Sequence, residues 1–247
     1  QYVDPSEFAH FTGPMMSSLP AIKMLGWVEK THNRSEFNNK VKKAKLPLTP
    51  TQQQLIKFVK GRQVYYPLLY VHSHHAEIEN MVSGLDLGAN KAWQMAMDKA
   101  RDSGSITITM EGDGAKNLLA FYPVYENKQL IETVAQRRSA LKGFALGLYS
   151  MSAIMEGIIG ASNNFSFMVR DMEHNAPQPF YISQHFVPSK LSGWQQQADV
   201  YSLDFNALDR QWLLTAKPHL DGLAFQYMLI PLLAIMLAFL ILAVHLR

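Results

Sequence analysis

The chain contains no cysteine among its 247 residues. A disulfide framework, a thiol nucleophile and a cysteine-ligated metal site are therefore excluded. The formal net charge is only +3, and no stripe of lysine and arginine alternates with aromatic residues, which argues against a nucleic-acid partner. The basic run Lys40–Lys45 is interpreted as the solvated end of a helix rather than a patch for nucleic acid or lipid.

Sequence motifs of hydrolytic and phosphate-binding enzymes are also missing. There is no nucleophile elbow and no His-Glu-x-x-His, and the glycine-containing segment Glu111–Gly114 lacks the following Lys-Ser/Thr of a phosphate-binding loop. The cluster His72–His75 with Glu77 and Glu79 has the residue types of a zinc or nickel site, but its spacing matches no closed four-ligand motif. We interpret it as a solvated loop. No catalytic residue, metal or cofactor is predicted, and the chain itself is not expected to be an enzyme.

The C-terminal part of the chain is strongly apolar. Leu223–Val244 contains no charged residue over about 22 positions, and a helix of this length extends roughly 33 Å, enough for a hydrocarbon core of about 30 Å. The sequence therefore predicts a transmembrane helix over residues 222–245. His245 and Arg247 follow it, which predicts a cytoplasmic C-terminus and places residues 1–221 outside the inner (plasma) membrane, in the periplasmic or extracellular space. Because Gln1 is not an initiator methionine, we expect an export signal before it and further sequence after Arg247.

The N-terminal part carries signals of a helix. Asp4–Glu7 contains an N-cap residue, a proline at the first helical position and an acid in the first turn. Large apolar residues then recur at steps of three and four: Phe8, Phe11, Met15, Leu19, Ile22 and Leu25. This pattern predicts a long helical segment within residues 1–45, bent at Pro14 and Pro20. Its apolar face is either packed in the core or forms a dimer seam, since both uses require the same pattern.

The segment from Tyr65 to Tyr125 is predicted to be the centre of a mixed α+β domain. Three runs rich in aromatic and β-branched residues indicate strands, and a helix is predicted from Asn90 to Ser103. Asp86 lies in a glycine-framed turn before that helix. A carboxylate buried among apolar groups must be paired, so Asp86 is either an N-cap or the hydrogen-bond acceptor for a small ligand.

An ordered series of motifs resembles the CHASE domain. In the first part of the chain the series consists of Glu7-Phe8, Leu19–Val28, Tyr66-Pro67, Gly84–Leu87, Ala100–Gly104, Thr109 and Tyr122–Tyr125. It continues with Arg138–Phe144, which resembles the family's link between lobes, with Phe165–Asp171, and with Leu203–Phe205 and Asp209–Trp212, which resemble its closing hairpin. The resemblance extends from about Glu7 to Val244.

The resemblance implies a fold and a role. CHASE domains are extracytoplasmic sensory domains, set between two membrane spans, of histidine kinases and nucleotide or cyclic-dinucleotide enzymes. They have a long N-terminal helix followed by two PAS-like lobes with antiparallel sheets, and they form dimers. The implied division is a helical stalk and dimer segment (1–45), a membrane-distal ligand-binding lobe (46–137), a membrane-proximal lobe (138–221) and the transmembrane helix (222–245).

The resemblance also implies a ligand site. In plant cytokinin receptors of this family, an aspartate before the helix and a backbone group on the next strand bind an adenine-type hormone, and these positions correspond to Asp86 and Ile108. The implied pocket is completed by Thr107, Thr109, Tyr66, Tyr70, Leu119 and Phe121. The loop Glu111–Gly114 departs from the plant pattern, so the ligand is expected to be an adenine-type compound or another small metabolite. The alternative is a membrane-tethered protein-interaction module with no small-molecule ligand.

Overall fold

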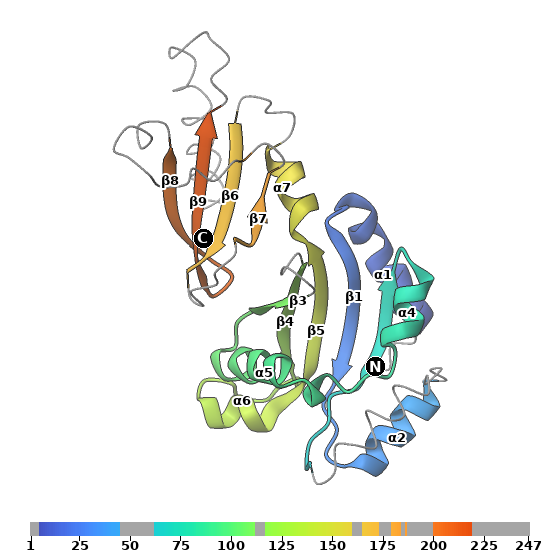
Figure 1. The fold of residues 1–247 in the computed structure, drawn as a ribbon. Helices are drawn as coiled ribbons and strands as arrows, with labels where there is room; N and C mark the ends of the chain where they lie inside the picture. The colour runs from blue at the N-terminus through green and yellow to red at the C-terminus, as the bar shows by residue number, and fades with distance from the viewer. Residues whose placement is uncertain are drawn as a thin grey trace.

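The computed structural model describes residues 5–44, 62–111, 117–159, 165–172, 179–183, 186 and 200–218. These residues form two lobes, each built on an antiparallel sheet (Figure 1). The two antiparallel sheets predicted from the sequence are therefore confirmed. The helix α7 (Met151–Ile159) follows the last strand of the first sheet and leads toward the second.

The first lobe contains a five-stranded sheet in the order β2-β1-β5-β4-β3. Its strands are β1 (Ile22–Glu29), β2 (Leu68–Ser73), β3 (Thr107–Glu111), β4 (Asn117–Tyr125) and β5 (Leu141–Ser150). Every neighbouring pair is antiparallel. The predicted lobe boundary between residues 137 and 138 falls within α6 (Val134–Ala140), and the sheet of the first lobe continues to Ser150 because β5 pairs with both β1 and β4.

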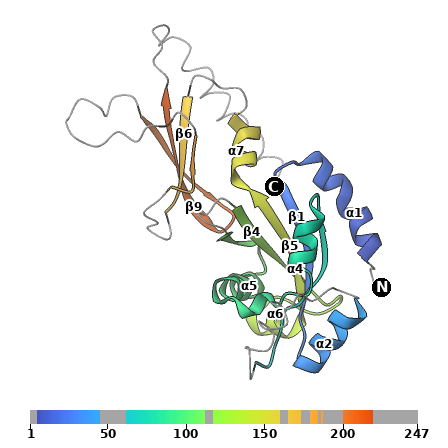
Figure 2. The ribbon, with the colours of Figure 1, turned by 45° about the vertical axis from the view of Figure 1, so that its right-hand side comes forward.

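Helices cover the two faces of this sheet. On one face, α4 (Ala76–Val82), the 3-10 turn η1 (Leu87–Ala89) and α5 (Lys91–Ser103) pack on a core that contains Phe121 and Phe144. On the other face, α1 (Pro5–Ser18) and α2 (Arg34–Lys43) pack on a separate cluster around β1 and β2. Figure 2 shows α5 and α6 together at one end of the sheet, away from α1.

The predicted helix from Asn90 to Ser103 is confirmed as α5. Asn90 caps its N-terminus by accepting hydrogen bonds from the backbone N–H groups of Ala92 (2.9 Å) and Trp93 (3.2 Å). Gly104 ends the helix with φ of 75°, a left-handed conformation that glycine adopts without steric cost.

The predicted long N-terminal helix is wrong. α1 ends at Ser18, and Ile22–Glu29 forms the strand β1 instead. Pro20 follows the helix end and does not continue it. Along β1 buried residues alternate with exposed or half-buried ones, so Ile22 and Leu25, predicted to share one helical face, point to opposite faces of a sheet. The spacings of three and four residues fitted a helix, but an apolar run this short is equally compatible with a strand.

The predicted fold also contained a C-terminal transmembrane helix, which the structure does not support. Within the described ranges, no helix is long and apolar enough to span a bilayer. The segment for which the helix was predicted, Leu223–Val244, lies outside the described residues.

The second lobe contains a four-stranded sheet in the order β7-β6-β9-β8. Its strands are β6 (Phe165–Asp171), β7 (Tyr181–Ile182), β8 (Tyr201–Ala207) and β9 (Arg210–Pro218). The lobes meet through an apolar cluster that includes Ile108 of β3, Met155 of α7 and Trp212 of β9. The second sheet therefore packs against the β3–β4 side of the first.

Candidate functional site

Asp86 is held by hydrogen bonds in the turn that precedes η1. The residue is 5% exposed. Its Oδ1 accepts the backbone N–H of Tyr66 at 2.9 Å and that of Gly88 at 3.1 Å. Its Oδ2 accepts a hydrogen bond from Arg62 Nη1 at 2.9 Å. Asp86 therefore caps the 3-10 turn η1, whereas the following helix α5 is capped by Asn90, and both carboxylate oxygens of Asp86 have partners within the chain.

The electrostatic balance at Asp86 combines two opposing effects. Burial raises the pKa of Asp86 above its ordinary value, and the hydrogen bonds from Tyr66 and Gly88 and the charge of Arg62 lower it, with burial the larger effect. The described groups that hydrogen-bond to the carboxylate, from Arg62, Tyr66 and Gly88, are all donors, which favours its ionised form. The ionised carboxylate therefore depends on Arg62 more than a surface aspartate depends on a neighbouring cation.

Arg62 closes the solvent side of this carboxylate. Its side chain is 20% exposed, whereas that of Asp86 is 5% exposed. The guanidinium carbon lies 5.5 Å from the ring centre of Tyr65, within range of a cation–π interaction. A Cβ at Gly88 would come within 2.0 Å of Arg62 Nη2. The glycine therefore allows the guanidinium to lie directly against the η1 backbone.

A row of aromatic rings runs from Asp86 across the sheet. The rings of Tyr66 and Phe144 have centres 5.7 Å apart, and those of Phe144 and Phe121 have centres 6.2 Å apart, both with edge-on geometry. Phe121 pairs with Thr107 on the neighbouring strand. Phe121 and Phe144 are fully buried, so side chains fill the space beneath α5.

Thr107 carries an unsatisfied polar atom at the far end of this row. The residue is 3% exposed, and its Oγ1 has no hydrogen-bond partner among the described residues. A buried hydroxyl without a partner is unfavourable by about 1–3 kcal/mol. Such an atom is therefore a candidate to hydrogen-bond a molecule that the chain itself does not provide.

The structure distributes the predicted pocket residues over more than one environment. Tyr66, Leu119 and Phe121 belong to the same core cluster, and Tyr66 contacts Asp86 directly. Thr107 and Thr109 are paired in register with Phe121 and Leu119 and so share their face of the sheet. Tyr70 packs in a different cluster, where its ring centre lies 5.9 Å from that of Phe8 in α1. The side chain of Ile108 points into the cluster between the lobes.

The predicted histidine loop is built into the first lobe. His72 belongs to β2, and His75 occupies the N-cap position of α4. His72 Nδ1 lies 2.6 Å from Thr12 Oγ1 of α1, which fastens that helix to the edge strand. Part of the predicted loop is therefore a strand.

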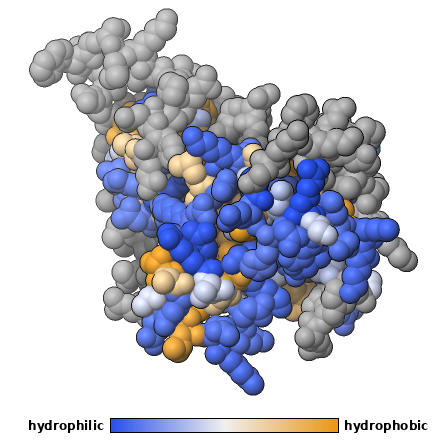
Figure 3. Space-filling model, turned by 90° about the horizontal axis from the view of Figure 1, so that it is seen from below, coloured by the Kyte–Doolittle hydropathy of each residue, from blue (hydrophilic) through white to orange (hydrophobic). Residues whose placement is uncertain are grey.

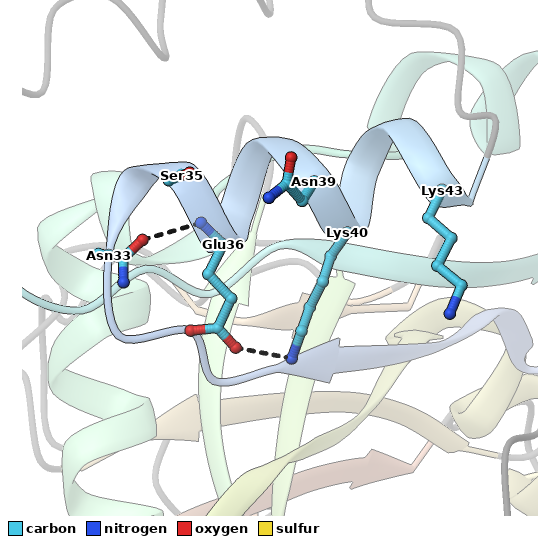
Figure 4. A pocket seen from close by; sticks show the side chains of 6 residues that line it. All are labelled: Asn33, Ser35, Glu36, Asn39, Lys40 and Lys43. Carbon is cyan, nitrogen blue, oxygen red and sulfur yellow. Dashed lines mark hydrogen bonds and ion pairs between the residues drawn. The ribbon is translucent and has the colours of Figure 1, made fainter.

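The chain also has an open hollow of about 420 Å³ along α2, lined by Asn33, Ser35, Glu36, Asn39, Lys40 and Lys43 (Figure 4). Asn33 Oδ1 accepts the N–H of Glu36 at 2.8 Å, and Lys40 Nζ bridges Glu36 at 3.0 Å and Glu29 at 2.7 Å. Asn33, Glu36 and Lys40 thus have partners on α2 itself and on Glu29 of β1. The hollow is therefore a surface feature of α2 rather than an enclosed site. Figure 3 shows apolar residues as small separate patches in a largely hydrophilic surface at the end of the molecule seen from below.

Comparison with protein families shows which family this chain belongs to. The family model of the CHASE domain matches residues 1–181. The chain belongs to the CHASE domain family. No curated protein matches the sequence. The CHASE match covers the whole first lobe, α7, β6 and the beginning of β7, so both the Asp86 turn and the Thr107 strand lie inside it.

Family membership confirms the coarse functional prediction. CHASE domains are extracytoplasmic sensory domains of membrane receptors, they are not catalytic, and they bind small-molecule ligands in general. Sequence reasoning identified Asp86 but missed Arg62 as its partner. The available signal was that a buried aspartate needs a cation as partner, and Arg62 is a basic residue three positions before Tyr65.

Proposed function

We propose that this CHASE domain is the small-molecule input domain of a membrane receptor and that its first lobe binds the ligand at Asp86. Occupancy is then passed across the membrane to a cytoplasmic output domain of the histidine-kinase or nucleotide-cyclase type. The observation that carries the proposal is the buried Asp86 carboxylate, whose only side-chain donor among the described residues is Arg62, on its solvent side.

The donor geometry at Asp86 defines the ligand chemistry that fits. Arg62 presents a planar N–H donor to Oδ2, and a ligand with an amino group on a planar ring, such as an adenine-type compound, replaces one such donor with another. Rotation of the Arg62 side chain frees Oδ2 while Oδ1 keeps its backbone bonds. Thr107 Oγ1, which has no hydrogen-bond partner among the described residues, supplies a second polar anchor on the sheet face that also carries Phe121.

The proposal includes a homodimer of the chain. Phe11 in the middle of α1, Met15 in its last turn and Leu19 just after its end are 75%, 46% and 54% exposed, and their spacing of four places them on one side of a helix. A second copy of the chain covers such a stripe without new polar partners. Sedimentation equilibrium of the chain and of Phe11→Glu tests this: the variant is expected to be monomeric at concentrations where the unmodified chain is dimeric, and a dimer of unchanged affinity would contradict it.

A second candidate function is a protein-interaction module without a small ligand. It is favoured by one observation: both oxygens of Asp86 are already paired within the chain, and the buried rings of Phe121 and Phe144 fill the adjacent face. In that case the Asp86 turn is purely structural.

Thermal-shift screening separates the two functions. The chain is screened against adenine derivatives, amino acids and organic acids, and every compound that stabilises it is tested again on Asp86→Asn. The matched control is Asp204→Asn, which changes an exposed aspartate of β8. Stabilisation lost in Asp86→Asn and kept in the control supports the proposal. Stabilisation that persists unchanged in Asp86→Asn removes Asp86 from the site, and no stabilisation by any compound class favours the interaction module.

A further inference from the structure

The turn between β8 and β9 contacts the outer edge of β3. β3 is the last strand of its sheet, so one side pairs with β4, and the other side has no strand partner among the described residues. At that open edge the N–H of Ile108 donates to Asp209 Oδ1 at 3.2 Å. The C=O of Ile108 accepts from Arg210 Nη2 at 3.0 Å. Two consecutive residues of the second lobe therefore satisfy both backbone groups of one residue of the first lobe.

Two ion pairs connect this contact to the rest of both lobes. Asp209 Oδ2 lies 2.7 Å from Lys99 Nζ, so Asp209 also links to α5 in the first lobe. Arg210 pairs with Asp171 of β6 in a side-chain contact that is largely buried on both sides. The turn is consequently tied to α5 and β3 on one side and to the centre of the second sheet on the other.

The backbone conformation of the turn is unfavourable for its two residues, which indicates that Asp209 is present for the sake of this contact. Leu208 and Asp209 have φ of 52° and 62°, the left-handed region that two-residue hairpin turns normally fill with asparagine or glycine. Leu208 is 44% exposed, so burial of its side chain does not explain the presence of leucine at this position. Asp209, in contrast, supplies the carboxylate that reaches Ile108 and Lys99.

We propose that the β8–β9 turn is a clasp through which the second lobe responds to the position of β3. This inference rests on the proposed function, because β3 also carries Thr107 and Thr109 of the candidate ligand site, on either side of Ile108. Displacement of β3 at the ligand site moves the Ile108 N–H and C=O, and Asp209 and Arg210 transmit that movement to β9 and, through Asp171, to β6.

Hydrogen–deuterium exchange of the full 247-residue chain tests the clasp without any ligand. In Asp209→Ala the Ile108 amide loses its acceptor, so its exchange rate is expected to rise at least about tenfold. Lys99→Met removes only the ion pair and is expected to give a smaller rise at the same amide, which keeps the test valid if Asp209→Ala folds poorly. Asp204→Asn, on the exposed β8 strand, is the control and is expected to leave Ile108 unchanged.

Transmission is tested by perturbing the first lobe in two backgrounds. Leu119→Ala loosens the core next to β3 and is expected to accelerate exchange in Arg210–Pro218 when the clasp is intact. In the Asp209→Ala background this acceleration is expected to disappear. Two results would overturn the proposal. One is an exchange rate of the Ile108 amide that does not change in Asp209→Ala, and the other is an acceleration of exchange in β9 by Leu119→Ala that is equal in both backgrounds. Because no ligand is used, these outcomes are distinct from a failure of the chain to bind small molecules.

Discussion

Replacement of Arg62 by methionine tests the electrostatic account of the candidate site. The substitution keeps an unbranched apolar chain of comparable length and removes the charge beside Asp86. Loss of one partner from a fully buried ion pair destabilises proteins by about 3–5 kcal/mol. Here Arg62 is 20% exposed, and Asp86 keeps its hydrogen bonds from Tyr66 and Gly88. We therefore expect a smaller loss near neutral pH, about 2 kcal/mol.

The pH dependence of this loss has a defined sign. The pKa of Asp86 is raised in the folded state because burial outweighs its hydrogen bonds. A carboxyl group with a raised folded pKa stabilises the fold at low pH, and this contribution disappears as the pH rises through the folded pKa. Removal of Arg62 raises the pKa of Asp86 further. The difference between the chain and Arg62→Met is thus expected to be small at acid pH, where Asp86 is protonated, and to grow toward neutral pH.

Urea unfolding over a pH series measures this difference. Arg170→Met is the matched control, since Arg170 is exposed on β6, and it is expected to change stability by no more than about 0.5 kcal/mol. A penalty for Arg62→Met that is independent of pH, or absent at neutral pH, would refute the view that Arg62 maintains the ionised Asp86.

Three further predictions concern individual residues. Gly88→Ala places a Cβ 2.0 Å from Arg62 Nη2. Because the guanidinium end can move away, we expect the ion pair to be lost and the free energy of unfolding to fall by about 1–2 kcal/mol. Urea unfolding checks this: the double variant Gly88→Ala/Arg62→Met is expected to be no less stable than Arg62→Met alone. Thr107→Val removes a buried hydroxyl that has no hydrogen-bond partner in the described part of the chain, and it is expected to raise the melting temperature by an amount equivalent to up to about 1 kcal/mol. A lower melting temperature would show that the hydroxyl is satisfied. Hydrogen bonds from Arg138 and Arg101 hold the pKa of Asp102 well below its ordinary value, so Asp102 stabilises the fold above its ordinary pKa, and this contribution is lost as the pH falls. In Asp102→Asn the melting temperature is therefore expected to fall less steeply between neutral and acid pH. An unchanged slope would contradict the assignment.

Local sequence signals predicted the elements whose determinants lie within a few residues. α5 follows from the Asn90 cap, its apolar face and the Gly104 stop, and the capping role of Asp86 follows from its place before a helical turn. The error at Ile22–Glu29 has the opposite origin. Its apolar residues are compatible with either period over a short span, and pairing with β2 and β5, remote in sequence, decides for the strand.

The partners of the site residues could not be predicted because they are distant in the chain. Arg62 reaches Asp86 across 24 positions, and no periodic pattern marks such a side-chain pair. Ile108 was expected to offer a backbone group to a ligand, yet its N–H meets Asp209, 101 positions away. The two lobes bring these residues together only when the second sheet packs against β3, so this contact is a property of tertiary structure.

The central claim is that Asp86 is the acceptor for a small-molecule ligand of the first lobe. Isothermal titration of a compound found by screening into the chain, Asp86→Asn and Asp204→Asn tests it most directly. We predict that Kd rises at least tenfold in Asp86→Asn, which corresponds to about 1.4 kcal/mol, and is unchanged in Asp204→Asn. Equal Kd values for the chain and for Asp86→Asn would contradict the claim.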